Sequence, residues 1–256
     1  MKFNTKGLIL TSKTLKGDQR LVTVMTGTHG VIRCFIKNRK LLSVSRSNAI
    51  QPLAYSRLSV YSGRDAYIID EADCIFSFFE TSTELEALAV AQYMCELCMY
   101  TVPDGVASQE IMSLLMNSLY VLSKHSKPEL MVKSVFEMRL MALSGMTPDI
   151  LACKDCGAYE DETMYFLIDK GELQCSSCYH GAPGACSLNR GALYVLRHSI
   201  LAEPKRIFSF STSDETLAQF ADCAERYALS KIERTFNSLE YYKKLINRPE
   251  FIKKEQ

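Results

Sequence analysis

The sequence predicts an α+β protein, in which a small N-terminal β-barrel precedes a helical domain that carries a cysteine-rich insert. Three observations predict this class. Short runs of β-branched and aromatic residues, separated by turn residues, fill the chain up to about residue 80. A helical pattern of apolar residues begins after Ser82. Two Cys-x-x-Cys pairs then interrupt the helical pattern between residues 149 and 186.

The composition is that of an ordinary globular protein. The chain has 256 residues, of which 47% are hydrophobic and 23% are charged. A chain of this length buries a large core without disulfides, so the ten cysteines need another explanation. No apolar run approaches the roughly 18 residues of a membrane span, and the N-terminus lacks the apolar segment of a signal peptide. We therefore expect a cytoplasmic protein with reduced thiols.

Charge is distributed unevenly along the chain. Residues 1–64 contain twelve lysines and arginines but only one acidic residue, Asp18, which gives this segment a formal charge of +11. The whole chain has a net charge of +1, so the remainder carries −10. The N-terminal segment is therefore predicted to bind a polyanion.

Five short strands are expected in a first domain that spans residues 1–80. Turn residues with glycine separate the strands at residues 16–18 and 26–30. The number of strands fits an OB-type barrel, although an SH3-like barrel would fit nearly as well. The expected strands are residues 7–15, 20–26, 31–36, 56–61 and 67–77, the last with an irregularity near Asp73.

A helical domain is expected over residues 81–247, with the insert at 149–186 and a polar tail at 248–256. Pro128 suits the first turn of a helix, and Gly145 suits its C-terminal end. Ser187 and Ser213 are predicted N-caps. The expected helices are residues 83–98, 108–123, 128–145, 188–201 and 214–236, with a shorter one that ends at 246.

The insert has the spacing of a zinc knuckle. Cys153 and Cys156 form one pair, and Cys175 and Cys178 form the second pair after eighteen intervening residues. A Cys-x-x-Cys turn lets two thiolates reach one ion, and zinc takes four such donors. Residues 164–168 and the turn at 169–171 read as a hairpin that folds the second pair back toward the first. His180 or Cys186 are the alternative fourth ligands.

Four thiolates leave no open coordination position, so one structural zinc ion is predicted rather than a catalytic one. A further pair, Cys95 and Cys98, lies in an apolar helical stretch and is interpreted as core. Cys34, Cys74 and Cys223 are assigned to packing for the same reason.

The basic segment contains a loop whose cations alternate with hydroxyl and amide side chains, which suits phosphate oxygens. A solvated edge without function is the alternative interpretation. Phe35, Tyr55, Tyr61 and Tyr67 could stack on bases, although aromatic residues at strand spacing are more often core. Arg33 could extend the patch. The residues predicted to contact the phosphates of a nucleic acid are Arg20, Lys37, Arg39, Lys40, Arg46 and Arg57.

Known catalytic motifs are missing from the sequence. We find no phosphate-binding loop, no Gly-x-Gly-x-x-Gly, no Gly-x-Ser-x-Gly and no His-Glu-x-x-His. None of the four histidines begins the His-x-Glu of a zinc deaminase. A binding protein without catalytic activity is therefore expected.

Taken together, these features resemble the RecO family of bacterial DNA repair and recombination mediators. The most specific stretch runs from Phe136 to Pro148 and leads into the cysteine knuckle with its Cys156-Gly157 step. Further segments similar to that family are residues 7–11, 17–20, 26–30, 51–53 and 233–239.

The resemblance implies an N-terminal OB fold and a helical domain with an inserted zinc knuckle. It implies a nucleoid-associated protein that binds single- and double-stranded DNA, anneals complementary strands and acts with RecR to help RecA replace the single-strand-binding protein. It also implies recognition of that protein's acidic C-terminal tail, which Arg139 could contact unless it pairs with Glu137, Glu96 or another acidic residue. The basic loop lies where the family's OB domain touches DNA, although Asn38 stands where many members have glycine.

Charge alone does not separate this interpretation from a second one. A zinc-containing adaptor that binds RNA or protein, without annealing activity, would also need a basic surface, because phosphate contacts are common to DNA and RNA. Preference for unstacked DNA over structured RNA would discriminate between the two.

Overall fold

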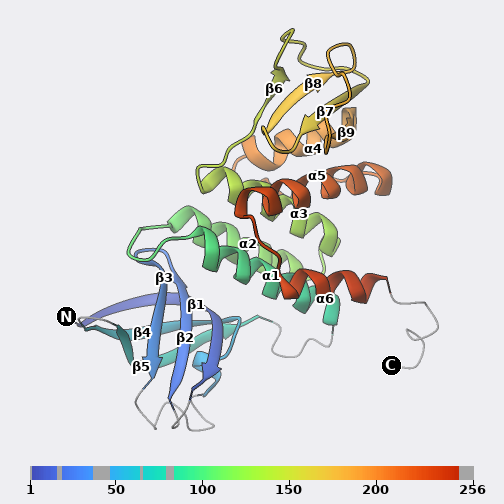
Figure 1. Cartoon of the computed structure of the whole chain (residues 1–256). Coiled ribbons are helices and arrows are strands. Elements are labelled where there is room, and N and C mark those ends of the chain that lie inside the picture. Colours follow the sequence, from blue (N-terminus) through green and yellow to red (C-terminus); the bar gives the residue numbers. More distant parts are fainter. Residues whose placement is uncertain (1, 16–18, 37–46, 64–65, 79–83, 248–256) are drawn as a thin grey trace, which may run out of the picture. The chain divides into compact units, whose positions relative to one another are not determined.

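The computed structural model describes residues 2–15, 19–36, 47–63, 66–78 and 84–247. The chain divides into two compact units. The first comprises Met1–Ser123 together with Phe236–Gln256, and the second comprises Lys124–Thr235. Figure 1 labels the elements of both units in chain order. Among the described residues, strands dominate the first part of the chain and helices the rest, so the predicted α+β class is confirmed.

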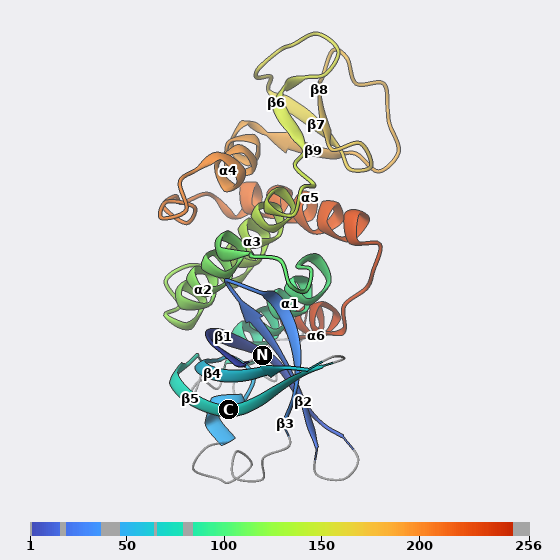
Figure 2. The same cartoon turned by 90° about the vertical axis from the view of Figure 1, so that its left-hand side faces the viewer.

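The first unit contains a closed five-stranded barrel with the strand order β1-β2-β3-β5-β4. Strand β3 pairs with β5 in parallel, and the other ladders are antiparallel. Strand β1 is long enough to pair with both β2 and β4, and Figure 2 shows it curving around the barrel. The strands are β1 (Lys2–Thr14), β2 (Arg20–Thr26), β3 (Gly30–Ile36), β4 (Ala54–Ser62) and β5 (Tyr67–Ser77), with a short 3-10 helix, η2 (Ser47–Ile50).

All five predicted strands occur, and β1 begins earlier than expected. The irregularity predicted near Asp73 is present as two register shifts between β4 and β5. One lies opposite Cys74–Phe76, and the other lies opposite Ile69–Glu71. Cys74 is exposed on the outer face of β5, so the expectation that it packs in the core is wrong. The shifts explain the error, because a bulge changes which residues of a strand face inward.

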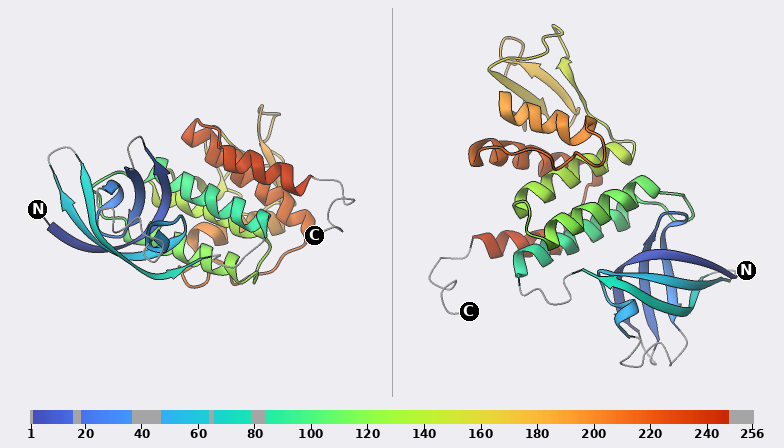
Figure 3. Two further views of the ribbon diagram at one scale, coloured as in Figure 1. Left: turned by 90° about the horizontal axis from the view of Figure 1, so that it is seen from below. Right: turned by 180° about the vertical axis from the view of Figure 1, so that it is seen from behind.

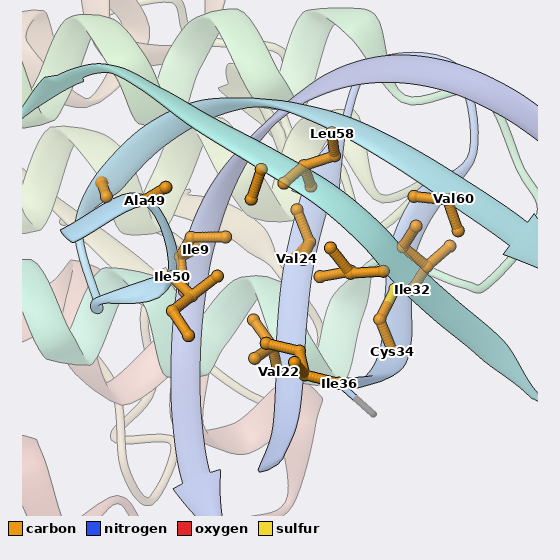
Figure 4. Close-up of a cluster of buried hydrophobic side chains, with 13 residues drawn as sticks. Ile9, Val22, Val24, Ile32, Cys34, Ile36, Ala49, Ile50, Leu58 and Val60 are labelled. Carbon is orange, nitrogen blue, oxygen red and sulfur yellow. The ribbon is translucent and has the colours of Figure 1, made fainter. Parts of the chain in front are cut away.

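The barrel is filled by alternate side chains of its strands, drawn in Figure 4. Val22 and Val24 from β2 meet Ile32, Cys34 and Ile36 from β3, and each is fully buried. Every second residue of a strand points into the barrel, because successive side chains lie on opposite faces of the strand. Burial of each such aliphatic side chain is worth about 1.5–3 kcal/mol. Ala49 and Ile50 of η2 complete the core.

Gly30 starts β3 and needs to be glycine for two reasons. Its φ of +61° is a left-handed conformation that strains residues with a Cβ. A Cβ at this position would also collide with the carbonyl oxygens of Pro103 and Val106. The turn between β2 and β3 therefore lies directly against the loop that precedes α2.

Three helices belong to the first unit: α1 (Leu85–Thr101), α2 (Gln109–Ser123) and α6 (Asn237–Ile246). Helix α6 packs along α1, as the two views of Figure 3 show. The ring of Phe236 lies edge-on to Tyr93 and Tyr100 of α1. Cys95 and Cys98 are buried in α1, as predicted, and burial raises the pKa of both thiols.

The second unit contains α3 (Glu129–Leu143), α4 (Arg190–Leu201) and α5 (Asp214–Ile232). Helix α3 begins directly after Pro128, and Gly145 follows its end with a φ of +83°. Lys133 of α3 is buried and pairs with Glu137 and Glu225 at 3.0 and 2.9 Å.

No described helix is both long and apolar enough to span a membrane.

One of the two predicted caps is correct. Ser213 caps α5 and accepts a hydrogen bond from the Thr216 amide. Ser187 lies in a strand, and Asn189 caps α4 by accepting from the Ala192 amide. Residues 186–189 form strand pairs before the helix starts, so the cap moves two positions along the chain.

The insert folds as a four-stranded sheet with the order β6-β8-β7-β9. Strands β7 and β8 form the predicted antiparallel hairpin. Gly171 ends its turn with a φ of +68°. The strands are β6 (Asp149–Cys153), β7 (Thr163–Leu167), β8 (Glu172–Cys175) and β9 (Cys186–Asn189).

Candidate metal centre and nucleic-acid interface

The four predicted zinc ligands come together in the insert. The sulfur atoms of Cys153, Cys156, Cys175 and Cys178 all lie within 4.8 Å of one another. The sulfurs of Cys156 and Cys175 are 3.6 Å apart. Zinc–sulfur bonds of about 2.3 Å at tetrahedral angles place sulfurs about 3.8 Å apart. The cluster therefore has the donor set and the dimensions of a tetrahedral metal site.

Each Cys-x-x-Cys pair is shaped by its own backbone turn. The Gly157 amide donates to the Cys153 carbonyl at 2.9 Å, and the Cys178 amide donates to the Cys175 carbonyl at 3.1 Å. Gly157 follows the first pair with a φ of +75°, a left-handed conformation that glycine adopts without strain.

The electrostatic environment of the sulfurs suits a bound cation. Burial opposes ionisation of Cys153, but backbone amides of Cys156, Cys175 and Asp155 donate to its sulfur and lower its pKa to about 6. Hydrogen bonds with the side chains of Cys175 and Cys156 raise the pKa of Cys178, and the charge of Cys153 adds a smaller effect in the same direction. A divalent ion would favour the thiolate form of all four cysteines.

Cys186, one of the two alternative fourth ligands, is engaged elsewhere. Its sulfur lies 3.3 Å from an Asp222 carboxylate oxygen and 3.1 Å from Arg226 Nη1. His180 lines a hollow beside Cys178 but is not part of the metal-sized cluster. The geometry thus favours the four-cysteine set over both substitutes.

Arg197 of α4 attaches the insert to the helices. Its guanidinium is buried and donates to the carbonyls of Ile150, Leu151 and Tyr159 at 2.6–2.8 Å. It also stacks on the Tyr159 ring at 4.0 Å. This role has no signal in the sequence, because an arginine in an amphipathic helix ordinarily faces solvent.

Four of the six predicted DNA-binding residues, Lys37, Arg39, Lys40 and Arg46, lie outside the described residues. The other two are on different parts of the barrel. Arg20 is the first residue of β2 and lies on the same strand face as the core residue Val22, two positions further on. It is therefore half-buried, on the inward side at one end of the barrel. Arg57 is exposed on β4, a strand that does not pair with β2.

A hollow of about 510 Å³ lies over β2, β3 and the start of β5. Arg33 and Phe35 of β3 line it beside Leu21 and Tyr67. Arg33 is exposed and Phe35 is half-buried, so a cation and an aromatic ring are both accessible. The acidic residue Asp104 also lines it. The β2–β3 face is the one that OB-type barrels use for oligonucleotides, and backbone contacts with base stacking are what these side chains supply.

Arg139 of α3 is half-buried, and its guanidinium donates to the Ile200 carbonyl in the last turn of α4. Cations at this position satisfy free carbonyls and interact favourably with the helix dipole. Neither alternative ion pair is formed: Glu137 pairs with Lys133, and Glu96 accepts from Ser238 at 2.6 Å.

A small closed barrel with a basic and aromatic face, joined to helices with a four-cysteine knuckle, defines an α+β protein with a candidate nucleic-acid interface and a candidate metal centre. Comparison with known proteins specifies it further. The profile described as "Recombination protein O N terminal" matches residues 1–78. The profile described as "Recombination protein O C terminal" matches residues 82–240. The chain therefore belongs to the RecO family of DNA repair proteins, and its N-terminal barrel is OB-like.

Individual relatives agree with this assignment. The DNA repair protein RecO of Acetivibrio thermocellus is 27% identical over 241 residues, which cover 94% of this chain and 96% of that protein. The DNA repair protein RecO of Caldicellulosiruptor bescii is 31% identical over 175 residues, or 68% of this chain and 71% of that protein. The similarity therefore extends over both the barrel and the helical part.

Proposed function

We propose that this protein is a recombination mediator that binds single- and double-stranded DNA, anneals complementary strands and helps RecA replace the single-strand-binding protein. The observation that carries the proposal is the hollow over β2 and β3, where Arg33 lies beside Phe35 and Tyr67 on an OB-like barrel. Membership of a DNA repair family supports it.

The proposed action requires no covalent chemistry. Arg33 and Arg20 neutralise phosphates, and Lys37, Arg39, Lys40 and Arg46 extend the contact. Stacking of a base on Phe35 or Tyr67 contributes about 1–3 kcal/mol. Six phosphate contacts with a single strand give a slope of log K against log salt of roughly −4. Two strands held on one basic domain repel each other less, which speeds their pairing.

We further propose one structural zinc ion on Cys153, Cys156, Cys175 and Cys178. The mutual distances of the sulfurs support this assignment, and four protein ligands leave no position for substrate. The test is the metal content of purified protein, with one zinc per chain expected. Well under one metal per chain, with melting unchanged by EDTA, would refute it.

For partners, we propose RecR and the acidic C-terminal tail of the single-strand-binding protein. Arg139 remains the candidate contact for the tail, although its bond to the Ile200 carbonyl leaves only part of its donor set available.

We also propose a domain boundary near residue 80. The barrel forms one domain, and residues 81–247 form the second.

Annealing of complementary labelled strands tests the function directly. The strands are coated with the host single-strand-binding protein, no ATP is added, and a coat protein without its acidic tail serves as control. Tail-dependent annealing supports mediator activity and the partner together. No annealing on coated or bare strands, with preference for structured RNA, would instead favour the adaptor.

A further inference from the structure

A second basic hollow lies on the barrel, over β1 and β4 rather than β2 and β3. Its volume is about 440 Å³, close to that of the first. The two hollows share no lining residue. The residues that line the second hollow all belong to the first unit and include Thr5, Lys6, Thr28, Tyr55, Arg57 and Gln109.

Two cations face each other across this hollow. Lys6 of β1 and Arg57 of β4 are directly paired in register, and both are exposed. Like charges opposite each other in a sheet are destabilising. Within the described part of the chain, neither forms an ion pair, although Asp73 lies opposite Arg57 on the β5 side. An anion bound between the two cations would relieve their repulsion.

The start of α2 adds to the positive potential of the hollow. Gln109 is the first residue of α2, and the preceding Ser108 amide donates to the Gly27 carbonyl at 2.9 Å. A side chain on Gly27 would collide with the Gln109 carboxamide, so the glycine permits this close approach. A helix N-terminus carries a partial positive charge that favours phosphate.

Neutral groups in the hollow fit a nucleotide rather than a simple ion. The hydroxyls of Thr5 and Thr28 lie 3.5 Å apart and can contact phosphate oxygens. Tyr55 is half-buried beside Arg57, and its ring contacts Phe76, which is 42% exposed, at a centroid distance of 5.3 Å. A cation next to an accessible aromatic ring is the arrangement that binds single strands.

We propose that this second hollow binds the phosphodiester backbone of a second single strand of DNA. The inference rests on the proposed annealing function and adds a division of labour to it. One strand lies on the β2–β3 face with Arg33 and Phe35. The other passes between Lys6 and Arg57, with Tyr55 stacking on a base.

The test is capture of a second strand by a preformed complex of the full-length protein with one strand. A non-complementary labelled oligothymidylate is added, and energy transfer between the two labelled strands reports capture. We expect the double variant Lys6→Gln, Arg57→Gln to lose capture at least tenfold and to reduce the magnitude of the salt slope by about 1.4. Affinity for the first strand should change less than threefold. Arg33→Gln should show the reverse pattern.

Lys2→Gln is the matched control, because Lys2 is an exposed cation of the same strand that pairs with Asp70 at 3.0 Å. Asp73→Asn removes a negative charge beside Arg57 and should raise capture two- to threefold. The Lys6→Arg variant should retain capture and exclude a folding defect.

Three outcomes are distinguishable. If the parent neither binds nor anneals DNA, the proposed function and this inference both fail. If the parent anneals and the double variant captures the second strand equally well, only the inference fails. If the double variant loses binding of labelled polyglutamate but captures oligothymidylate as well as the parent does, the hollow is a site for acidic peptide and the inference is overturned.

Discussion

The barrel and the cysteine knuckle are both small β-structures, but different forces hold them together. The barrel closes its hydrogen-bond ladders and buries a continuous aliphatic core with η2. The knuckle has strands of only four or five residues and a cluster of four cysteine sulfurs. A closed barrel with its own apolar core therefore stabilises the first region, whereas the knuckle packs its few apolar side chains against α4 and α5 and would gain further stability from the proposed zinc ion.

The largest difference is expected from removal of a ligand. Cys175→Ser should abolish stoichiometric zinc, because structural zinc sites contribute roughly 10–16 kcal/mol of apparent binding free energy. Hydrogen exchange should then show lost protection in β6–β9 and unchanged protection in β1–β5. Cys74→Ser, an exposed cysteine outside the cluster, is the matched control. Equal loss of protection in β6–β9 and in β1–β5 would show that the stability of the barrel also depends on the cysteine cluster.

Truncation of the barrel core should give the opposite pattern. Ile32 is fully buried, and Ile32→Ala should destabilise the first unit by about 2–5 kcal/mol. Zinc content should stay at the parent level, since no ligand comes from the barrel. Denaturation followed by exchange in β2 and β3 measures the effect. Loss of zinc in this variant would show that the knuckle depends on the barrel.

Attachment of the knuckle can be tested at Arg197. Arg197→Met leaves the carbonyls of Ile150, Leu151 and Tyr159 without this donor, and we expect a cost of about 2–4 kcal/mol in the second unit. The Arg190→Met variant, at an exposed position of the same helix, should cost less than about 0.5 kcal/mol. Metal content should remain near one per chain, which would separate attachment of the insert from formation of its site.

The sequence predicted the knuckle better than the barrel face because the chemistry of the knuckle is local. Two Cys-x-x-Cys turns and a hairpin bring four ligands together with little help from the rest of the fold. The barrel strands were also predicted, but their order in the sheet was not. In the observed order β2 and β4 are not neighbours, so Arg20 and Arg57 lie on strands that do not pair. Arg33 and Phe35 share a hollow because they lie two apart on one strand face, a signal that alternation alone could have given.

Other features depend on contacts distant in sequence and had no local signature. Asn189 replaces Ser187 as the cap because β9 pairs with β7 up to Asn189. The register shifts in β4–β5 accompany the exposure of Cys74. Arg197 binds carbonyls 38–47 residues away in the chain. The position of the α4 cap, the exposure of Cys74 and the partners of Arg197 all depend on tertiary contacts. The periodicity of a single segment carries no information about such contacts.

The smallest expected effect concerns Tyr227 of α5, which lies under the turn of the β7–β8 hairpin. Burial raises the pKa of its hydroxyl to about 12, and the hydroxyl donates to the Met146 carbonyl at 3.0 Å. Its ring also packs edge-on against Phe166. Tyr227→Phe removes one neutral hydrogen bond and should cost about 0.5–1.5 kcal/mol at pH 8.

The raised pKa of Tyr227 determines how its contribution to stability changes with pH. The unfolded chain ionises tyrosine near pH 10, whereas the folded protein resists ionisation until about pH 12. The contribution of Tyr227 is therefore complete below pH 10 and is lost as the pH rises through 12. The stability difference between parent and Tyr227→Phe should shrink between pH 10 and 12, measured by denaturant unfolding at each pH. A difference that stays constant over this range would mean that the hydroxyl reaches water, and that the hairpin turn is not held tightly against α5.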